Sequence, residues 1–220
     1  MTEKLRYTVK SRTKLDIDDI VAYIREGRAY LAALFGNVDV EPANIEIFGN
    51  QNWPYKSETV GCYDKSSRKI EILYKENKED FFNTLVHEMN HQILFDLSKN
   101  TPKWMSEGMA GYHSIKQGKI VYGEAKDYEL GLVKEAASKG KMVRLEDLVR
   151  SRICFEDERK FLAYAEAWSF VFFLIKTNRM PRYFNKMKAG NTNCPTTDEI
   201  KILEPVWADY LDRLITSLPC

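Results

Sequence analysis

The chain of 220 residues is long enough to bury a hydrophobic core and corresponds to one domain, or to one domain with a small appendage. Its 33 basic and 32 acidic residues nearly balance, and no basic stripe stands out, which argues against nucleic acid or an anionic membrane as the main partner. The four cysteines are far apart and form no Cys-x-x-Cys pair, which argues against a cysteine metal site.

The start of the chain, Met1 to Arg6, is polar, and no apolar run follows it. No segment is apolar over the length that a membrane span requires. We therefore expect a cytoplasmic protein with reduced thiols and no membrane partner, although a chain trimmed of a targeting segment would look the same.

The first part of the chain predicts a small sheet with one helix. Residues 4–9 could form a short strand, and apolar residues recur at helical spacing from Leu15 to Phe35. Asn44–Phe48 alternates like a strand. Thr59–Tyr63 and Lys69–Leu73 predict a hairpin or two neighbouring strands.

Everything that follows is predicted to be helical. The expected helices are Phe81–Leu97, Thr101–Tyr112, Asp127–Ser138, Leu145–Val149, Phe161–Ile175, Arg182–Lys188 and Glu204–Leu218. The helix Phe161–Ile175 is apolar nearly all round, which predicts that it is buried. The expected fold class is α+β in a single domain over residues 1–220, with a small mixed or antiparallel sheet in 1–76 and mostly helices in 77–220.

The first of these helices contains the pattern His-Glu-x-x-His at His87, Glu88 and His91. Residues four apart lie one turn above each other on a helix, so the two histidines can point their imidazoles at one metal ion. Glu88 flanks that position, which suits a base acting on metal-activated water. The alternative, two unrelated surface histidines, requires a chance match in a chain with only three histidines.

A catalytic zinc site needs a third protein ligand. The metzincin pattern would place a histidine at position 97, which is Leu97. Glu107 on the next helix is the favoured third ligand, and the alternative is an ordinary surface glutamate. His113 is a rival, but on a continuous helix it would lie about 240° round from Glu107, so the two could not share one ion.

Two glycines, Gly108 and Gly111, lie close to Glu107. Each glycine inside a helix costs about 1 kcal/mol relative to alanine. We expect them because this helix must approach the helix of the two histidines closely.

The pattern His-Glu-x-x-His followed by Pro-x-Trp-x-x-Glu-Gly-x-Ala-x-Tyr, which runs from Pro102 to Tyr112, resembles the gluzincin metallopeptidases, the group of thermolysin and the alanyl aminopeptidases. It is closer still to the small bacterial peptidase-MA-like domains. The resemblance covers most of the chain, although its apolar helices are weaker evidence than the ligand motif. It implies a zincin-like fold, one zinc ion per chain and a peptide or protein substrate.

The resemblance also implies how a substrate is held. In this group the strand nearest the cleft binds extended peptide by strand addition, and here that strand would be Thr59–Tyr63 or Ile70–Leu73. Gly61, Cys62 and Tyr63 are therefore candidate substrate-binding residues. Gly61 would allow close backbone approach, or it marks a bulge in the strand.

By the same analogy a tyrosine of the helical lobe stabilises the oxyanion. Tyr164 is the best candidate, with Tyr112, Tyr122 and Tyr128 in reserve, and the alternative for Tyr164 is a packing role. One position departs from the group. Gluzincins commonly carry an acidic residue four positions after the glutamate ligand, where it orients a histidine, and here that position is Gly111. Glu166 or a backbone carbonyl could take its place.

The expected function is a zinc metallopeptidase in which Glu88 takes a proton from the attacking water and passes it to the leaving amine. The alternative is a metal-binding or protein-interaction module that kept the fold and lost turnover, which Gly111 favours and the intact Glu88 argues against. A DNA-linked protease with three histidine ligands fits less well, because a third suitable histidine and a basic charge are both missing. The sequence leaves open endo- or exopeptidase action and the oligomeric state.

Overall fold

The structure, a computed structural model, describes residues 7–11, 17–35, 41, 43–55, 59–75, 77–116, 119–150, 155 and 159–217. The contacts within the chain define two compact units. The first comprises Met1–Lys99 and His113–Tyr122, and the second comprises Asn100–Tyr112 and Gly123–Cys220. Each unit is described by itself.

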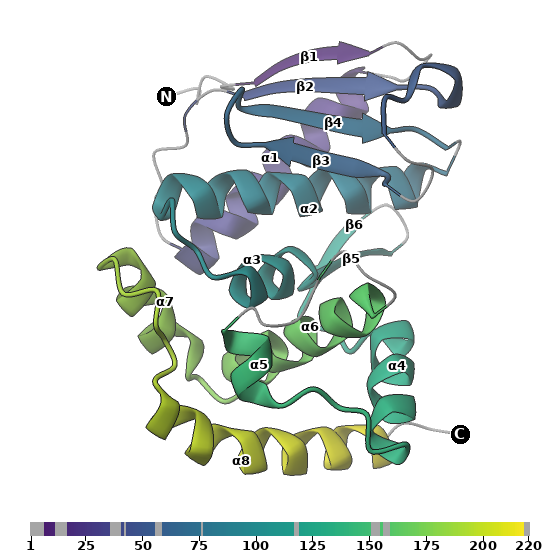
Figure 1. The fold of residues 1–220 in the computed structure, drawn as a ribbon. Coiled ribbons are helices and arrows are strands. Elements are labelled where there is room, and N and C mark those ends of the chain that lie inside the picture. The colour runs from purple at the N-terminus through teal and green to yellow at the C-terminus, as the bar shows by residue number, and fades with distance from the viewer. Residues whose placement is uncertain are drawn as a thin grey trace. The chain divides into compact units, whose positions relative to one another are not determined.

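The first unit is built on a four-stranded mixed sheet (Figure 1). Its strands are β1 (Tyr7–Ser11), β2 (Ala43–Phe48), β3 (Gly61–Asp64) and β4 (Lys69–Leu73), with a short 3-10 helix η1 (Asn50–Asn52) after β2. The strand order is β1-β2-β4-β3, in which only the β3–β4 pair is antiparallel. The predicted small, partly antiparallel sheet and the β3–β4 hairpin are therefore confirmed. The first strand extends past the predicted end at residue 9 to Ser11, and residues 4–6 are outside the described part of the chain.

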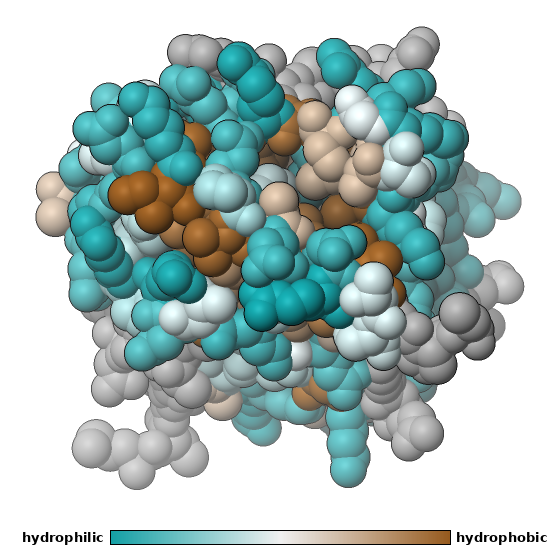
Figure 2. All heavy atoms as spheres, turned by 90° about the horizontal axis from the view of Figure 1, so that it is seen from below, coloured by the Kyte–Doolittle hydropathy of each residue, from teal (hydrophilic) through white to brown (hydrophobic). Residues whose placement is uncertain are grey.

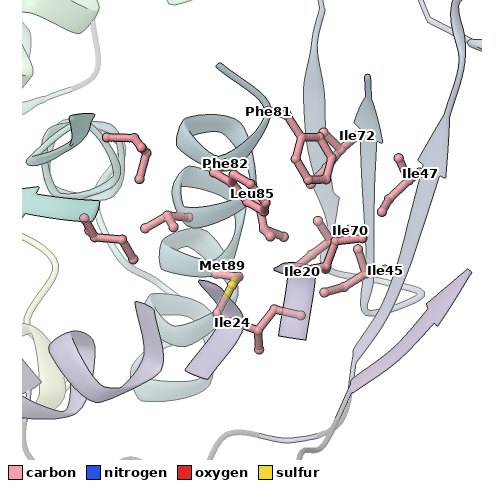
Figure 3. Close-up of a cluster of buried hydrophobic side chains, with 13 residues drawn as sticks. Ile20, Ile24, Ile45, Ile47, Ile70, Ile72, Phe81, Phe82, Leu85 and Met89 are labelled. Carbon is pink, nitrogen blue, oxygen red and sulfur yellow. The ribbon is translucent and has the colours of Figure 1, made fainter. Parts of the chain in front are cut away.

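Helices α1 (Ile17–Phe35) and α2 (Lys78–Leu97) cover one face of this sheet (Figure 1). The Asn77 side chain caps α2 by accepting hydrogen bonds from the backbone N–H groups of Glu79 and Asp80. The core that joins the helices to the sheet is shown in Figure 3 and includes Ile20, Ile24, Ile45, Ile47, Ile70, Ile72, Phe81, Phe82, Leu85 and Met89. Although α2 lies in the part of the chain that was predicted to be mostly helical, residues 77–220, its apolar stripe packs against the sheet.

The expectation that everything after α2 is helical is wrong at one place. Strands β5 (His113–Lys116) and β6 (Lys119–Tyr122) form an antiparallel hairpin that packs against α2 within the first unit. Ile115 and Ile120 face each other across this hairpin and join the core. The backbone N–H of Ile115 also donates to the side chain of Asn83 on α2, at 3.0 Å. Gly118, between Ile115 and the apolar run Ile120–Tyr122, was the turn signal that could have indicated this hairpin.

The second unit is helical in its described part. It contains α3 (Lys103–Ala110), α4 (Asp127–Ser138), α5 (Leu145–Val149), α6 (Lys160–Lys176), α7 (Met180–Lys188) and α8 (Thr197–Thr216). Helix α6 contacts α3, α4, α7 and α8, and its Trp168, Phe170 and Phe173 are almost completely buried, which confirms the predicted buried helix. Helix α8 begins before the predicted Glu204, because Thr196 and Glu199 form a capping box at its start.

Among the described helices, none combines the length and the apolar character that crossing a membrane requires. On the face shown in Figure 2, hydrophobic residues appear in separate patches among hydrophilic ones.

Candidate metal centre

Two imidazoles meet on one face of α2. The Nε2 atoms of His87 and His91 are 3.1 Å apart, and both side chains are half-buried. Two nitrogens bound tetrahedrally to zinc at about 2.0–2.1 Å are separated by about 3.3 Å. The helix therefore already holds the two nitrogens at nearly the spacing of a chelated pair, as the four-residue periodicity predicted.

Glu107 on α3 completes a group that could hold a metal ion. The ligand atoms of His87, His91 and Glu107 all lie within 4.8 Å of one another. The Glu107 side chain is only 4% exposed, which disfavours the alternative of an ordinary surface glutamate. Two imidazoles and one carboxylate are the donor set of His₂Glu zinc sites, so the chemistry of these residues fits the ion.

Glu88 is buried next to His87, and the backbone of β3 passes directly beside it. A Cβ atom placed on Gly61 would lie 2.4 Å from Cγ2 of Thr84 and 2.9 Å from Oε1 of Glu88. Only glycine allows this approach. Gly61 does not mark a bulge, because Gly61 and the residues after it pair with β4 in continuous register. Gly61 thus allows β3 to approach α2, and its predicted contact with substrate stays a prediction.

The other two predicted substrate-binding residues follow Gly61 on β3, which lies at an edge of the described sheet, whereas β4 is paired on both sides. Of the two strands considered, only β3 therefore has an edge available for strand addition. Cys62 is half-buried, and burial, followed by the nearby charge of Glu88, raises the pKa of its thiol. The thiol therefore stays protonated at neutral pH. The ring of Tyr63 packs edge-on against Phe95 of α2.

Gly108, one of the two glycines near Glu107, lies against a different helix from the one expected. A Cβ on Gly108 would lie 2.4 Å from the carbonyl oxygen of Ala167 and 2.5 Å from Cγ2 of Val171, both on α6. Gly108 therefore allows α3 to pack against α6, and the expectation that it serves the approach to α2 is not what the contacts show. Gly111 ends α3, and its N–H donates to the carbonyl of Glu107 at 2.8 Å.

His113, the rival ligand, lies on β5 and not on a continuation of α3, so the helical angle used to exclude it does not apply. The side chain is buried, and its Nε2 is 3.1 Å from the backbone oxygen of Asn83. A carbonyl only accepts, so Nε2 carries the proton and donates it there. His113 is therefore a buried histidine that is hydrogen-bonded to the backbone of α2.

The tyrosines considered as oxyanion donors lie in different surroundings. Tyr164 on α6 is half-buried and packs edge-on against Phe155. Tyr112 is buried beside Phe172, Tyr122 is half-buried in the β5–β6 hairpin, and Tyr128 is 65% exposed. The role of Tyr164 stays a prediction.

Glu166 was considered as a substitute for the acidic residue missing at Gly111. It is fully buried on α6, and its Oε1 accepts a hydrogen bond from the backbone N–H of Val143 at 3.0 Å. Among the described residues, its Oε2 has no hydrogen-bond partner. Burial raises the pKa of Glu166 to about 7, against the opposing effects of Val143 and Arg159. Glu166 thus holds the backbone at Val143, and none of its hydrogen-bond partners among the described residues is a histidine.

One residue near the candidate ligands was missed. Lys103, the first residue of α3, places its Nζ 2.7 Å from Oε1 of Glu107. The spacing of four residues in the sequence was the signal that could have revealed it.

Residues 82–196 match the protein family described as "Protein of unknown function (DUF1570)". The matched region includes His87, Glu88, His91 and Glu107. No curated protein and no solved structure matches the chain. Because the match extends over just over half of its 220 residues, the chain belongs to the family described as "Protein of unknown function (DUF1570)".

Proposed function

We propose that this protein is a zinc-dependent metallopeptidase in which His87, His91 and Glu107 hold the ion. The observation that supports this most is the group of two imidazoles and a buried carboxylate within 4.8 Å, with Glu88 buried next to His87. A purely structural metal site needs no additional carboxylate beside it. The peptidase class rests on the resemblance to the gluzincins and the peptidase-MA-like domains.

When bound, zinc supplies the Lewis acidity that brings the deprotonation of water close to neutral pH and polarises a carbonyl. The proton transfers belong to Glu88, which takes the proton of the attacking water and delivers it to the leaving amine. The backbone of β3 at Gly61 lies beside the Glu88 side chain.

The substrate in this proposal is an extended peptide or a protein segment. The edge of β3 offers backbone donors and acceptors to which such a segment can add as a strand. Tyr164 is the proposed donor to the oxyanion.

A second candidate function is a zincin-like module that binds a metal or a protein without turnover. The observation that favours it is Gly111, which leaves no acidic side chain at the position that orients a histidine in the gluzincins. The two candidates differ in whether Glu88 has a chemical task.

The experiment that separates them compares the wild type with Glu88→Gln. We expect about one zinc ion per chain in both proteins by elemental analysis. Hydrolysis of a fluorogenic peptide library should fall by about 10²–10⁴-fold in the variant, because only the proton transfer is lost. Glu79→Gln, an exposed change on the same helix, is the matched control and should leave both values unchanged.

Equal inactivity of the wild type and Glu88→Gln, with zinc retained, would favour the module. A wild type that holds no zinc when supplied with it would contradict the metal assignment itself.

A further inference from the structure

The structure places a cation against the proposed glutamate ligand. Nζ of Lys103 lies 2.7 Å from Oε1 of Glu107, one turn further along α3. The Glu107 side chain is 4% exposed and that of Lys103 is 47% exposed. The ammonium thus reaches from the surface to a buried carboxylate.

Helix energetics do not explain a lysine at this position. The positive end of the helix dipole disfavours a cation in the first turn. A lysine four residues before a glutamate is also the less favourable order of such a pair. Pro102, at the N-cap, offers no side-chain hydrogen bond that would relieve this end of α3. The reason for Lys103 must therefore lie in what it contacts.

Two contacts define the position of the ammonium. Besides Glu107, Lys103 has its Nζ 5.8 Å from the centre of the Phe155 ring, within the range of a cation–π interaction. A carboxylate as buried as that of Glu107 needs a partner, because burial of an unpaired charge is costly. Lys103 supplies such a partner at Oε1.

We propose that Lys103 is a positioning residue that holds Oε1 of Glu107 and so presents the other carboxylate oxygen to the metal. The inference rests on the proposed function. It also concerns the acidic residue that is missing at Gly111. In the gluzincins that residue orients a histidine ligand, whereas here Lys103 would orient the glutamate ligand. Hydrogen-bond partners of metal ligands typically change metal affinity by about 10- to 100-fold when they are removed.

The test measures zinc affinity by competition with a chromophoric chelator at pH 7.5. Lys103→Met, which keeps most of the aliphatic stem, should weaken zinc binding by about 10- to 100-fold. Lys103→Arg keeps the donor and the charge and should stay close to the wild type. Lys139→Met is the matched control, because Lys139 forms an exposed pair with Glu135 at the same spacing on α4.

A second readout uses the visible absorption of the Co²⁺-loaded protein, which reports on how the carboxylate binds. We expect an altered spectrum for Lys103→Met and recovery in Lys103→Arg. If Lys103→Met misfolds by circular dichroism, Lys103→Gln, which retains a neutral donor, takes its place and should give an intermediate affinity.

Unchanged or tighter zinc binding by Lys103→Met would overturn the role of Lys103 and leave the proposed function standing. A wild type that binds no zinc would overturn both. Loss of hydrolysis in Glu88→Gln does not depend on the result for Lys103→Met, so the two failures can be told apart.

Discussion

At the scale of single residues, three buried glutamates show different solutions to the cost of burying a carboxylate. Glu107 is paired with the ammonium of Lys103. Glu166 accepts one backbone hydrogen bond from Val143 and has a strongly raised pKa. Glu88 lies against β3 at Gly61, next to the two histidines. At Glu166, burial favours the neutral carboxylic acid.

Glu166 should make the stability of the protein depend on pH. Its folded-state pKa of about 7 lies above the ordinary value of 4.5, so between these values the folded chain keeps a proton that the unfolded chain releases. The free energy of unfolding therefore falls as the pH rises through this window, by about 3 kcal/mol in all. Glu166→Gln should remove this fall and be more stable than the wild type at pH 8.

Urea unfolding of both proteins at pH 5 and pH 8 measures this difference. Glu124→Gln, an exposed change, should keep the pH dependence of the wild type. The same pH dependence in the wild type and Glu166→Gln would show that Glu166 is not the group responsible.

At the scale of elements, the position of Glu107 depends on how α3 packs. A helix of eight residues is marginal alone, so α3 is held by tertiary contacts. Trp104 and Met105 are fully buried, and Gly108 lies against the backbone of α6. The long buried helix α6 therefore sets where the short helix and its glutamate lie within the second unit.

This predicts opposite effects for one substitution at two helical glycines. Alanine is favoured over glycine in a helix by about 1 kcal/mol, and Gly131 on α4 has open space around it, so Gly131→Ala should stabilise the protein by about that amount. Gly108→Ala would force a Cβ to within 2.4 Å of the Ala167 carbonyl. It should destabilise the protein by about 1–3 kcal/mol and weaken metal binding.

Chemical denaturation and a zinc titration measure both effects. Equal stabilisation by the two substitutions would mean that the contact between α3 and α6 is looser than the structure shows.

At the scale of the whole molecule, the chain passes between the two units more than once. It leaves the first unit after Lys99, returns to it at His113 for the β5–β6 hairpin, and enters the second unit again at Gly123. The segment that contains Glu107 is thus preceded by α2, with the two histidines, and followed by a hairpin that packs on α2.

Removal of the metal should lower the thermal stability of the folded chain. A ligand that binds only the folded state at a hundred times its dissociation constant stabilises it by about 2.7 kcal/mol. Treatment with EDTA should therefore lower the Tm, and added zinc should restore it. Differential scanning fluorimetry of the wild type and His87→Ala checks this, since the variant should not respond to either treatment. An EDTA-insensitive Tm in a zinc-loaded wild type would contradict the prediction.

Much of the fold and of the candidate site followed from local patterns. Apolar residues at helical spacing predicted α1, the run of apolar residues from Phe161 to Ile175 predicted the buried α6, and alternation predicted β2. The spacing of His87 and His91 predicted that their nitrogens would meet, because four residues on a helix return to the same face. Such features depend on residues close in the chain, so the sequence alone contains them.

Contacts between distant segments needed the tertiary structure. The sequence showed that Gly61 and Gly108 were unusual, but only the fold shows that one lies against Glu88 and the other against Ala167. The fold also forms the β5–β6 hairpin and packs it on α2, in a part of the chain that was expected to contain only helices. Periodicity tells which face of an element is buried, but it does not tell which other element buries that face. The surroundings of Glu88 and Glu166 depend on that other element, so only the tertiary structure decides them.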